Sequence, residues 1–122
     1  MICTADQKLG AGSIVTNGGI RDLASIQRRA PGFQVFASGL VVSHGNAAIL
    51  EVGVPVAVGG LPIQSGDLLH GDENGVLTVP LDLAAAVLEQ AKRVREVESE
   101  FFNFLQSPAY NYEQMKRRIG AH

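Results

Sequence analysis

Between residues 33 and 79 the chain is a series of short apolar runs, separated at close intervals by Gly, Pro, Asn and Asp. Runs of this length are typical of strands, whereas a helix needs an unbroken 3.6-residue period over ten or more positions. We therefore expect a body built from short strands. The expected strands are 33–37, 40–43, 47–52, 55–58 and 61–63.

The next two apolar runs, 68–70 and 76–79, flank a segment rich in turn residues, Gly71-Asp72-Glu73-Asn74-Gly75. This spacing predicts a β-hairpin in which Asn74-Gly75 supplies the positive φ of the turn. Asp67, Asp72 and Glu73 could instead be read as metal ligands. The loop does not match the EF-hand spacing, and Asp and Asn are favoured in turns, so the hairpin is the favoured interpretation.

From Leu81 onward the pattern becomes helical. It predicts a long amphipathic helix that starts near Asp82 and ends at Ser107-Pro108, followed by a shorter helix over 112–119. We expect residues 1–80 to form the main domain and residues 81–122 a helical extension of it. Whether the apolar face of the extension packs on its own sheet or on another subunit is left open. The apolar positions are Leu83, Val87, Ala91, Val94, Phe101 and Leu105.

The composition excludes several classes of protein. With 122 residues, 46% of them hydrophobic, the chain suits one globular domain, and its formal charge of −2 gives no footprint for nucleic acid. Cys3 is the single cysteine, so no internal disulfide forms and we expect a reducing, cytoplasmic location. The N-terminus lacks the pattern of a signal peptide, and the apolar stretch 47–61 is too interrupted to span a membrane.

The N-terminal part predicts a helix that ends at Gly10, a strand over 13–16 and a turn at Asn17-Gly18-Gly19. A short helix is expected over 20–29, until Pro31-Gly32 breaks it. Arg21 and Asp22 would then lie in the first turn of that helix.

Segment 12–22 carries the residues best suited to chemistry. Gly18 and Gly19 would let a ligand approach the backbone closely. Arg21 offers a planar guanidinium suited to a carboxylate, and Asp22 offers hard oxygen ligands for Mg²⁺ or Mn²⁺. Taken by spacing alone, the segment is more simply a plain turn in which Asp22 caps the helix and Arg21 pairs with it or with solvent.

Other reactive side chains give weaker signals. His44 and His70 have no partner at metal-ligand spacing, and no serine lies in a nucleophile-elbow pattern. The three lysines, Lys8, Lys92 and Lys116, lie near the chain start or on polar helical faces, which disfavours a buried Schiff-base lysine. If the protein cleaves carbon–carbon bonds, metal stabilisation of an enolate is the more plausible route.

Segment 12–22, Gly-Ser-Ile-Val-Thr-Asn-Gly-Gly-Ile-Arg-Asp, resembles the core motif of the RraA-like family. That family includes the regulator of ribonuclease activity A and the class II 4-hydroxy-4-methyl-2-oxoglutarate aldolases. Segment 55–60 and the landmarks from Gly66-Asp67 to Pro80 match the family pattern in the same order, and the resemblance covers roughly residues 5–105.

The resemblance implies an α/β fold, a three-layer β/β/α sandwich of the swivelling-domain type, assembled as a trimer or hexamer. It implies a metal-dependent aldolase or decarboxylase that releases pyruvate from 4-hydroxy-4-methyl-2-oxoglutarate or oxaloacetate. In that family pattern Arg21 binds the substrate carboxylate and Asp22 holds Mg²⁺ or Mn²⁺.

Two departures from the aldolase pattern keep alternatives open. Ser25 stands where the pattern has an acidic residue, and family members are longer at the N-terminus, so the chain corresponds to their C-terminal portion. The alternative function is that of a non-catalytic, protein-binding regulator of ribonuclease activity. A third interpretation is a structural fragment without activity of its own.

Overall fold

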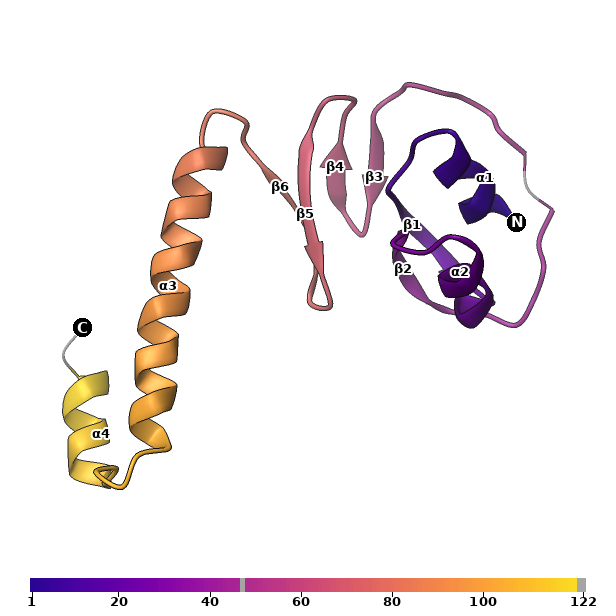
Figure 1. The fold of residues 1–122 in the computed structure, drawn as a ribbon. Coiled ribbons are helices and arrows are strands. Elements are labelled where there is room, and N and C mark those ends of the chain that lie inside the picture. The colour runs from indigo at the N-terminus through magenta and orange to yellow at the C-terminus, as the bar shows by residue number, and fades with distance from the viewer. Residues whose placement is uncertain (47, 121–122) are drawn as a thin grey trace. The chain divides into compact units, whose positions relative to one another are not determined.

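A computed structural model describes residues 1–46 and 48–120. The chain divides into two compact units, Met1–Leu81 and Asp82–His122. Within the described residues, the first unit holds the strands, arranged in three two-stranded sheets, and the second is helical (Figure 1). The mixed helix and strand composition agrees with the predicted α/β class. The described helices include none with the length and apolar content that a bilayer-spanning helix requires.

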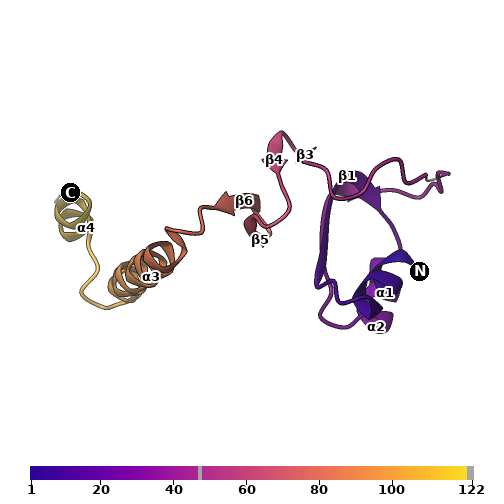
Figure 2. The ribbon, with the colours of Figure 1, turned by 90° about the horizontal axis from the view of Figure 1, so that it is seen from above.

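The first sheet is parallel and pairs β1 (Ser13–Ile20) with β2 (Gln34–Leu40). A parallel pair needs a crossover connection, and here α2 (Leu23–Arg29) provides it. The helix α1 (Ile2–Lys8) lies beside α2 on one side of β1 (Figure 2).

A small core lies between these two helices and the sheet. Its buried residues are Cys3, Ala30 and Phe33, against which Ile14 and Val35 of the sheet pack. The Gln7 side-chain amide donates to the Pro31 carbonyl at 2.9 Å, which fastens α1 to the loop before β2. The core therefore holds the β1–α2–β2 segment, which carries the candidate residues, in place.

Two antiparallel hairpins follow in the same unit. The strands β3 (Val56–Val58) and β4 (Leu61–Ile63) are joined by Gly59 and Gly60, whose φ angles are 60° and 83°. Two successive positive φ angles are the signature of a type I′ turn, which glycine adopts without a steric penalty. The strands β5 (Leu68–Asp72) and β6 (Gly75–Val79) form the second hairpin.

The second hairpin confirms the sequence prediction, with one difference: the positive φ belongs to Gly75 alone, not to Asn74. The Asp72 carboxylate closes the turn, because it accepts hydrogen bonds from the backbone N–H of Asn74 at 2.8 Å and from its side-chain amide at 3.3 Å. Asp67 has a comparable local role, accepting from the Gln64 N–H at 2.7 Å. These contacts support the turn interpretation of both carboxylates.

The helical unit consists of α3 (Ala84–Leu105) and α4 (Tyr112–Ile119), close to the predicted limits. Asn111 caps α4 by accepting from the Gln114 N–H at 2.9 Å. Phe104 is buried between the two helices, with the Tyr110 ring at 5.8 Å and the Arg118 guanidinium 4.4 Å from its ring centre. Val87 and Val94, on the predicted apolar stripe, are about half exposed.

Three strand predictions were wrong. β1 does not end at Thr16 but runs through the predicted turn to Ile20, and β2 is one strand where two were expected. The parallel ladder between them supplies partners that override local turn chemistry. Ala47, the first residue of the strand predicted over 47–52, lies outside the described residues, and residues 48–52 form no strand.

Hydrogen bonding to Asn74, through its backbone first and its side chain second, lowers the pKa of Asp72 below its usual value of 3.8. Folding therefore favours the ionised carboxylate, so its contribution is present above pH 3.8 and is lost as the pH falls through the lower, folded value. We expect the amide proton shift of Asn74 to titrate by NMR with a midpoint below pH 3.8. In Asp72→Asn this titration should vanish, and a midpoint at or above 3.8 would contradict the contact.

Candidate functional site

Arg21 and Asp22 leave the end of β1 and lead directly into α2. Asp22 is the N-cap residue, in the left-handed conformation with φ 61° and ψ 34°. Among the described residues other than glycine, it is the one with a positive φ. This region is costly for L-residues, although aspartate tolerates it better than most. Backbone strain of this kind is concentrated at functional sites.

The Asp22 side chain does not cap its helix. The backbone carbonyl of Asp22 accepts from the N–H groups of Ser25 and Ile26 at 2.8 and 3.0 Å, but its carboxylate makes no capping bond. The capping role considered from the sequence is therefore absent. The predicted position also changes: both residues precede α2 and do not lie in its first turn.

Arg21 and Asp22 form an ion pair with the guanidinium Nε 3.4 Å from the carboxylate Oδ2. Both side chains are exposed, with 43% and 68% of their surface accessible. Exposed pairs contribute at most about 1 kcal/mol to stability, so this contact is easily exchanged for others.

A cavity of about 440 Å³ adjoins this pair. Arg21 and Asp22 line it on one side, and the end of β2 and the residues that follow it, Leu40 to Val42, line the other. The structure thus brings both predicted side chains to one hollow with an apolar wall. Sequence reasoning did not include this wall, because it depends on the register between β1 and β2.

Gly18 and Gly19 lie inside β1, and neither has a positive φ. A Cβ on Gly19 would collide with Cγ1 of Val41, and a Cβ on Gly18 would lie 3.3 Å from the Thr16 hydroxyl oxygen. The lack of a side chain is therefore needed at Gly19 to make room for Val41, and the close approach of a ligand at these two glycines stays a prediction.

The other residues considered from the sequence lie elsewhere. His44 and His70 are exposed, as are all three lysines, so no lysine lies in the buried setting that a Schiff-base lysine needs. Within residues 1–46 and 48–120 no three His, Cys, Asp or Glu side chains gather as a metal-binding group.

Asp22 can still contribute to a metal site. Its side chain is exposed and the residue lines a cavity, and Mg²⁺ is typically held by one or two carboxylates together with waters and substrate oxygens. The donor chemistry therefore fits a hard divalent cation, provided that most of its ligands come from outside this chain's acidic residues.

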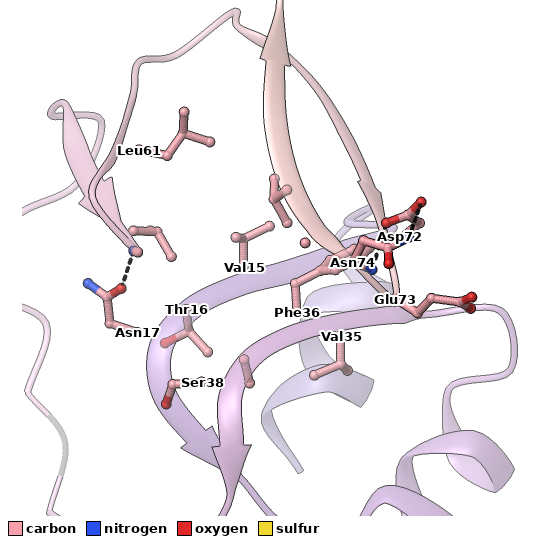
Figure 3. Close-up of a pocket in the computed structure, with 15 residues that line it drawn as sticks. Val15, Thr16, Asn17, Val35, Phe36, Ser38, Leu61, Asp72, Glu73 and Asn74 are labelled. Atoms are coloured by element: carbon pink, nitrogen blue, oxygen red, sulfur yellow. Dashed lines mark hydrogen bonds between the residues drawn. The ribbon is translucent and has the colours of Figure 1, made fainter. Parts of the chain in front are cut away.

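A second cavity, of about 580 Å³, lies between the first sheet and the two hairpins (Figure 3). Val15 and Phe36 come from the sheet, Leu61 from β4 and Asp72 from the tip of the second hairpin. Asn17 lies at its edge. From the sequence, Asn17 was interpreted as a turn residue only. An Asn followed by two glycines directly after an apolar run is also compatible with an irregularity in strand pairing, which the structure shows between Thr16 and Gly19.

These features define a small α/β domain with an exposed Arg-Asp pair at the mouth of a cavity. The sequence model of the RraA-like family, described as Aldolase/RraA, matches residues 1–78. The chain therefore belongs to the RraA-like family, which confirms the resemblance seen in its sequence.

Curated relatives agree with this assignment. The chain is 35% identical over 86 residues to a "Putative 4-hydroxy-4-methyl-2-oxoglutarate aldolase" of Halalkalibacterium halodurans, a match that covers 70% of this chain and 40% of that protein. A protein of the same name from Ectopseudomonas mendocina is 32% identical, with 69% and 51% covered. An uncharacterized protein of Methanocaldococcus jannaschii is 32% identical, with 73% and 42% covered.

The chain spans about half or less of the length of these relatives. No solved structure matches it significantly.

The stability of the site is testable at Gly19. In Gly19→Ala the new methyl group would collide with Val41, whose β-branched side chain is stiff, so the free energy of unfolding should fall by about 1–3 kcal/mol. Gly39, the β-ladder partner of Gly19, has open space around it, so Gly39→Ala is the matched control.

Urea unfolding of both variants measures the difference. Adding Val41→Ala to Gly19→Ala should restore most of the loss. Equal stability of Gly19→Ala and Gly39→Ala would show that the close contact does not exist.

Proposed function

We propose that this chain carries the substrate-binding and metal-binding pair of a divalent-metal-dependent lyase, one that releases pyruvate from an oxo-acid such as 4-hydroxy-4-methyl-2-oxoglutarate or oxaloacetate. The observation that carries the proposal is the Arg21-Asp22 pair at one cavity, with Asp22 in a strained backbone conformation and its carboxylate not used as a cap. The names of two relatives point to the same reaction class.

The proposed roles follow from the chemistry of each side chain. The Arg21 guanidinium presents a planar set of donors that can bind a substrate carboxylate through two hydrogen bonds. Asp22 supplies oxygen ligands to Mg²⁺ or Mn²⁺, which when bound would polarise the substrate keto group as a Lewis acid. Leu40 to Val42 supply apolar side chains to the cavity lining, against which the carbon chain of the substrate would lie.

The assembly is part of the proposal. The chain spans about half or less of its relatives' length, so the layered β/β/α sandwich and the trimeric or hexameric state belong to the proposed complete enzyme. Additional ligands for the cation, which the described residues do not supply as a cluster, would come from water, substrate and other parts of that assembly.

The metal role of Asp22 is tested by Asp22→Asn. Asparagine tolerates the left-handed conformation, so the fold should survive while the charge is lost. We expect the rate of Mg²⁺-dependent pyruvate release from oxaloacetate to fall at least 100-fold. The pyruvate is measured by coupling its reduction to NADH oxidation with lactate dehydrogenase. The background from Mg²⁺ without protein is subtracted, since the ion alone promotes decarboxylation.

Asp82→Asn, an identical change before α3, is the matched control and should retain wild-type activity. Wild-type activity that persists in excess chelator, or in Asp22→Asn, would refute the metal-dependent mechanism.

Arg21→Lys tests substrate binding separately. Lysine keeps the charge but cannot form two parallel bonds to a carboxylate, so we expect KM for oxaloacetate to rise about tenfold. Thermal unfolding should be nearly unchanged, because the exposed pair with Asp22 contributes little to stability. A rise in KM of similar size in Arg28→Lys, on the exposed side of α2, would show that the effect is not specific.

A second candidate function is the non-catalytic, protein-binding regulator of ribonuclease activity. It is favoured by Ser25, which stands three positions after Asp22, where the aldolase pattern has an acidic residue. Ribonuclease binding that survives both chelator and Asp22→Asn, with no pyruvate release from the wild type, would support the regulator over the lyase.

A further inference from the structure

The pairing between β1 and β2 contains one extra residue on β1. Thr16 pairs with Ala37 and Gly19 with Gly39, so two residues of β1, Asn17 and Gly18, face the single residue Ser38. This is a β-bulge, and because side chains alternate along a strand, the extra residue moves every later side chain to the opposite face. The bulge therefore sets the facing of Gly19 and Ile20, the last two residues of β1 before Arg21 and Asp22.

Side chains satisfy the backbone of the bulge. The Gly18 N–H donates to the Thr16 hydroxyl at 3.0 Å, and the Ser38 hydroxyl donates to the Gly18 carbonyl at 3.1 Å. Both polar groups of the unpaired residue thus have partners, which removes the usual reason for a bulge to slip back into regular pairing.

Asn17 connects this bulge to the β3–β4 hairpin. Its side-chain nitrogen donates to the Ala57 carbonyl at 2.9 Å, and its side-chain oxygen accepts from the Gly59 N–H (Figure 3). Ala57 and Gly59 flank Val58, so the amide bonds to the two backbone groups that a residue of a neighbouring parallel strand would use. One side chain therefore holds the edge of β3 against the bulge, with its donor and its acceptor both used.

This contact links segments forty residues apart in the sequence at the point where β1 changes face. The hairpin end that it holds is short, because Gly59 and Gly60 connect β3 and β4 in a two-residue turn. A hairpin bonded to position 17 restrains the backbone of β1 a few residues before the ion pair.

We propose that Asn17 is a positioning residue for the Arg21-Asp22 pair: by clamping the β3–β4 hairpin to the bulge of β1, it fixes the orientation in which the pair meets its ligands. The inference rests on the proposed function for its catalytic readout. Asn17 itself is not among the residues that line the 440 Å³ cavity.

The test compares Asn17→Ala, which removes both hydrogen bonds, with Asn17→Asp, which keeps the acceptor and loses the donor. Asn103→Asp, on an exposed face of α3 outside the residues matched by the family model, is the matched control. In Asn17→Asp at neutral pH the ionised carboxylate would repel the Ala57 carbonyl, whereas a protonated carboxyl can donate to it and restore the clamp.

No titratable side chain lies on β1, β2, β3 or β4, and the charged groups on the adjoining cavity are Asp72 and Glu73. Their negative charges favour the protonated form of an aspartate at position 17. The kcat of Asn17→Asp is therefore expected to recover as the pH is lowered and the new carboxyl becomes protonated.

We expect Asn17→Ala to stay folded by circular dichroism, to bind Mn²⁺ as the wild type does, and to lower kcat about 10–100-fold, as misplacement of reacting groups by about 1 Å does. Asn17→Asp should show the same loss at pH 7.5 and recover toward the wild type as the pH is lowered. Gly59 amide exchange should accelerate in Asn17→Ala, which removes the acceptor of the Gly59 N–H, and not in Asn103→Asp.

Three results would overturn the proposal. They are a wild-type kcat in Asn17→Ala, a loss of kcat that merely follows the loss of folded protein, and a Gly59 amide exchange rate in Asn17→Ala that equals that of the wild type. If the wild type releases no pyruvate, the proposed function fails by itself. The positioning role of Asn17 is then tested by the NMR signals of the Arg21 Nε–H and the Asp22 amide. These signals should shift in Asn17→Ala but not in Asn103→Asp. Unchanged signals in Asn17→Ala would refute the role.

Discussion

The one-residue slip between β1 and β2 is the constraint on which the candidate site depends. Parallel pairing brings residues 13–20 alongside 34–40, and the extra residue at the bulge reverses the facing of everything beyond it. The slip would be unfavourable if it left buried or crowded backbone groups without partners. Thr16 and Ser38 supply those partners, Asn17 attaches the neighbouring hairpin, and Gly19 leaves room for Val41. A run that looks like simple turn chemistry thus encodes a strand with a defined irregularity.

This irregularity shows where prediction from the sequence succeeds and where it stops. The β5–β6 hairpin, the strand Leu61–Ile63 and the helix Tyr112–Ile119 were predicted correctly, because each depends on signals within a few residues: a turn, a short apolar run, or a cap at Asn111. The predicted turn at 17–19 and the break between 37 and 40 were wrong. In both places the deciding partner lies about twenty residues away, and a ladder of backbone hydrogen bonds outweighs a local preference for turns.

The candidate site likewise has some properties that the local sequence predicts and others that it does not. Arg21 and Asp22 were identifiable from their residue types, since a guanidinium beside a carboxylate suits an oxo-acid and a cation. Nothing local predicted that Asp22 would adopt a left-handed conformation, leave its helix uncapped, or share a cavity with Leu40 to Val42. Those properties follow from how β1 delivers the chain to α2 and from where β2 ends. The roles of Arg21 and Asp22 in binding, like those of Gly18 and Gly19, stay predictions until ligand binding is measured.

The ion pair itself suggests how the proposed ligands would bind. Without ligands, Arg21 and Asp22 partly satisfy one another at 3.4 Å, in water and at small gain in free energy. A cation binding alone would leave the guanidinium without its partner, and an oxo-acid binding alone would leave the carboxylate without one. When both bind, one weak contact is replaced by two charge-assisted ones, Arg21 to the substrate carboxylate and Asp22 to the cation. Each ligand thereby removes the cost that the other would meet. Because the exposed pair contributes at most about 1 kcal/mol, each ligand would strengthen the binding of the other only modestly, and the affinity for the cation would depend mainly on the further oxygen ligands that complete its coordination.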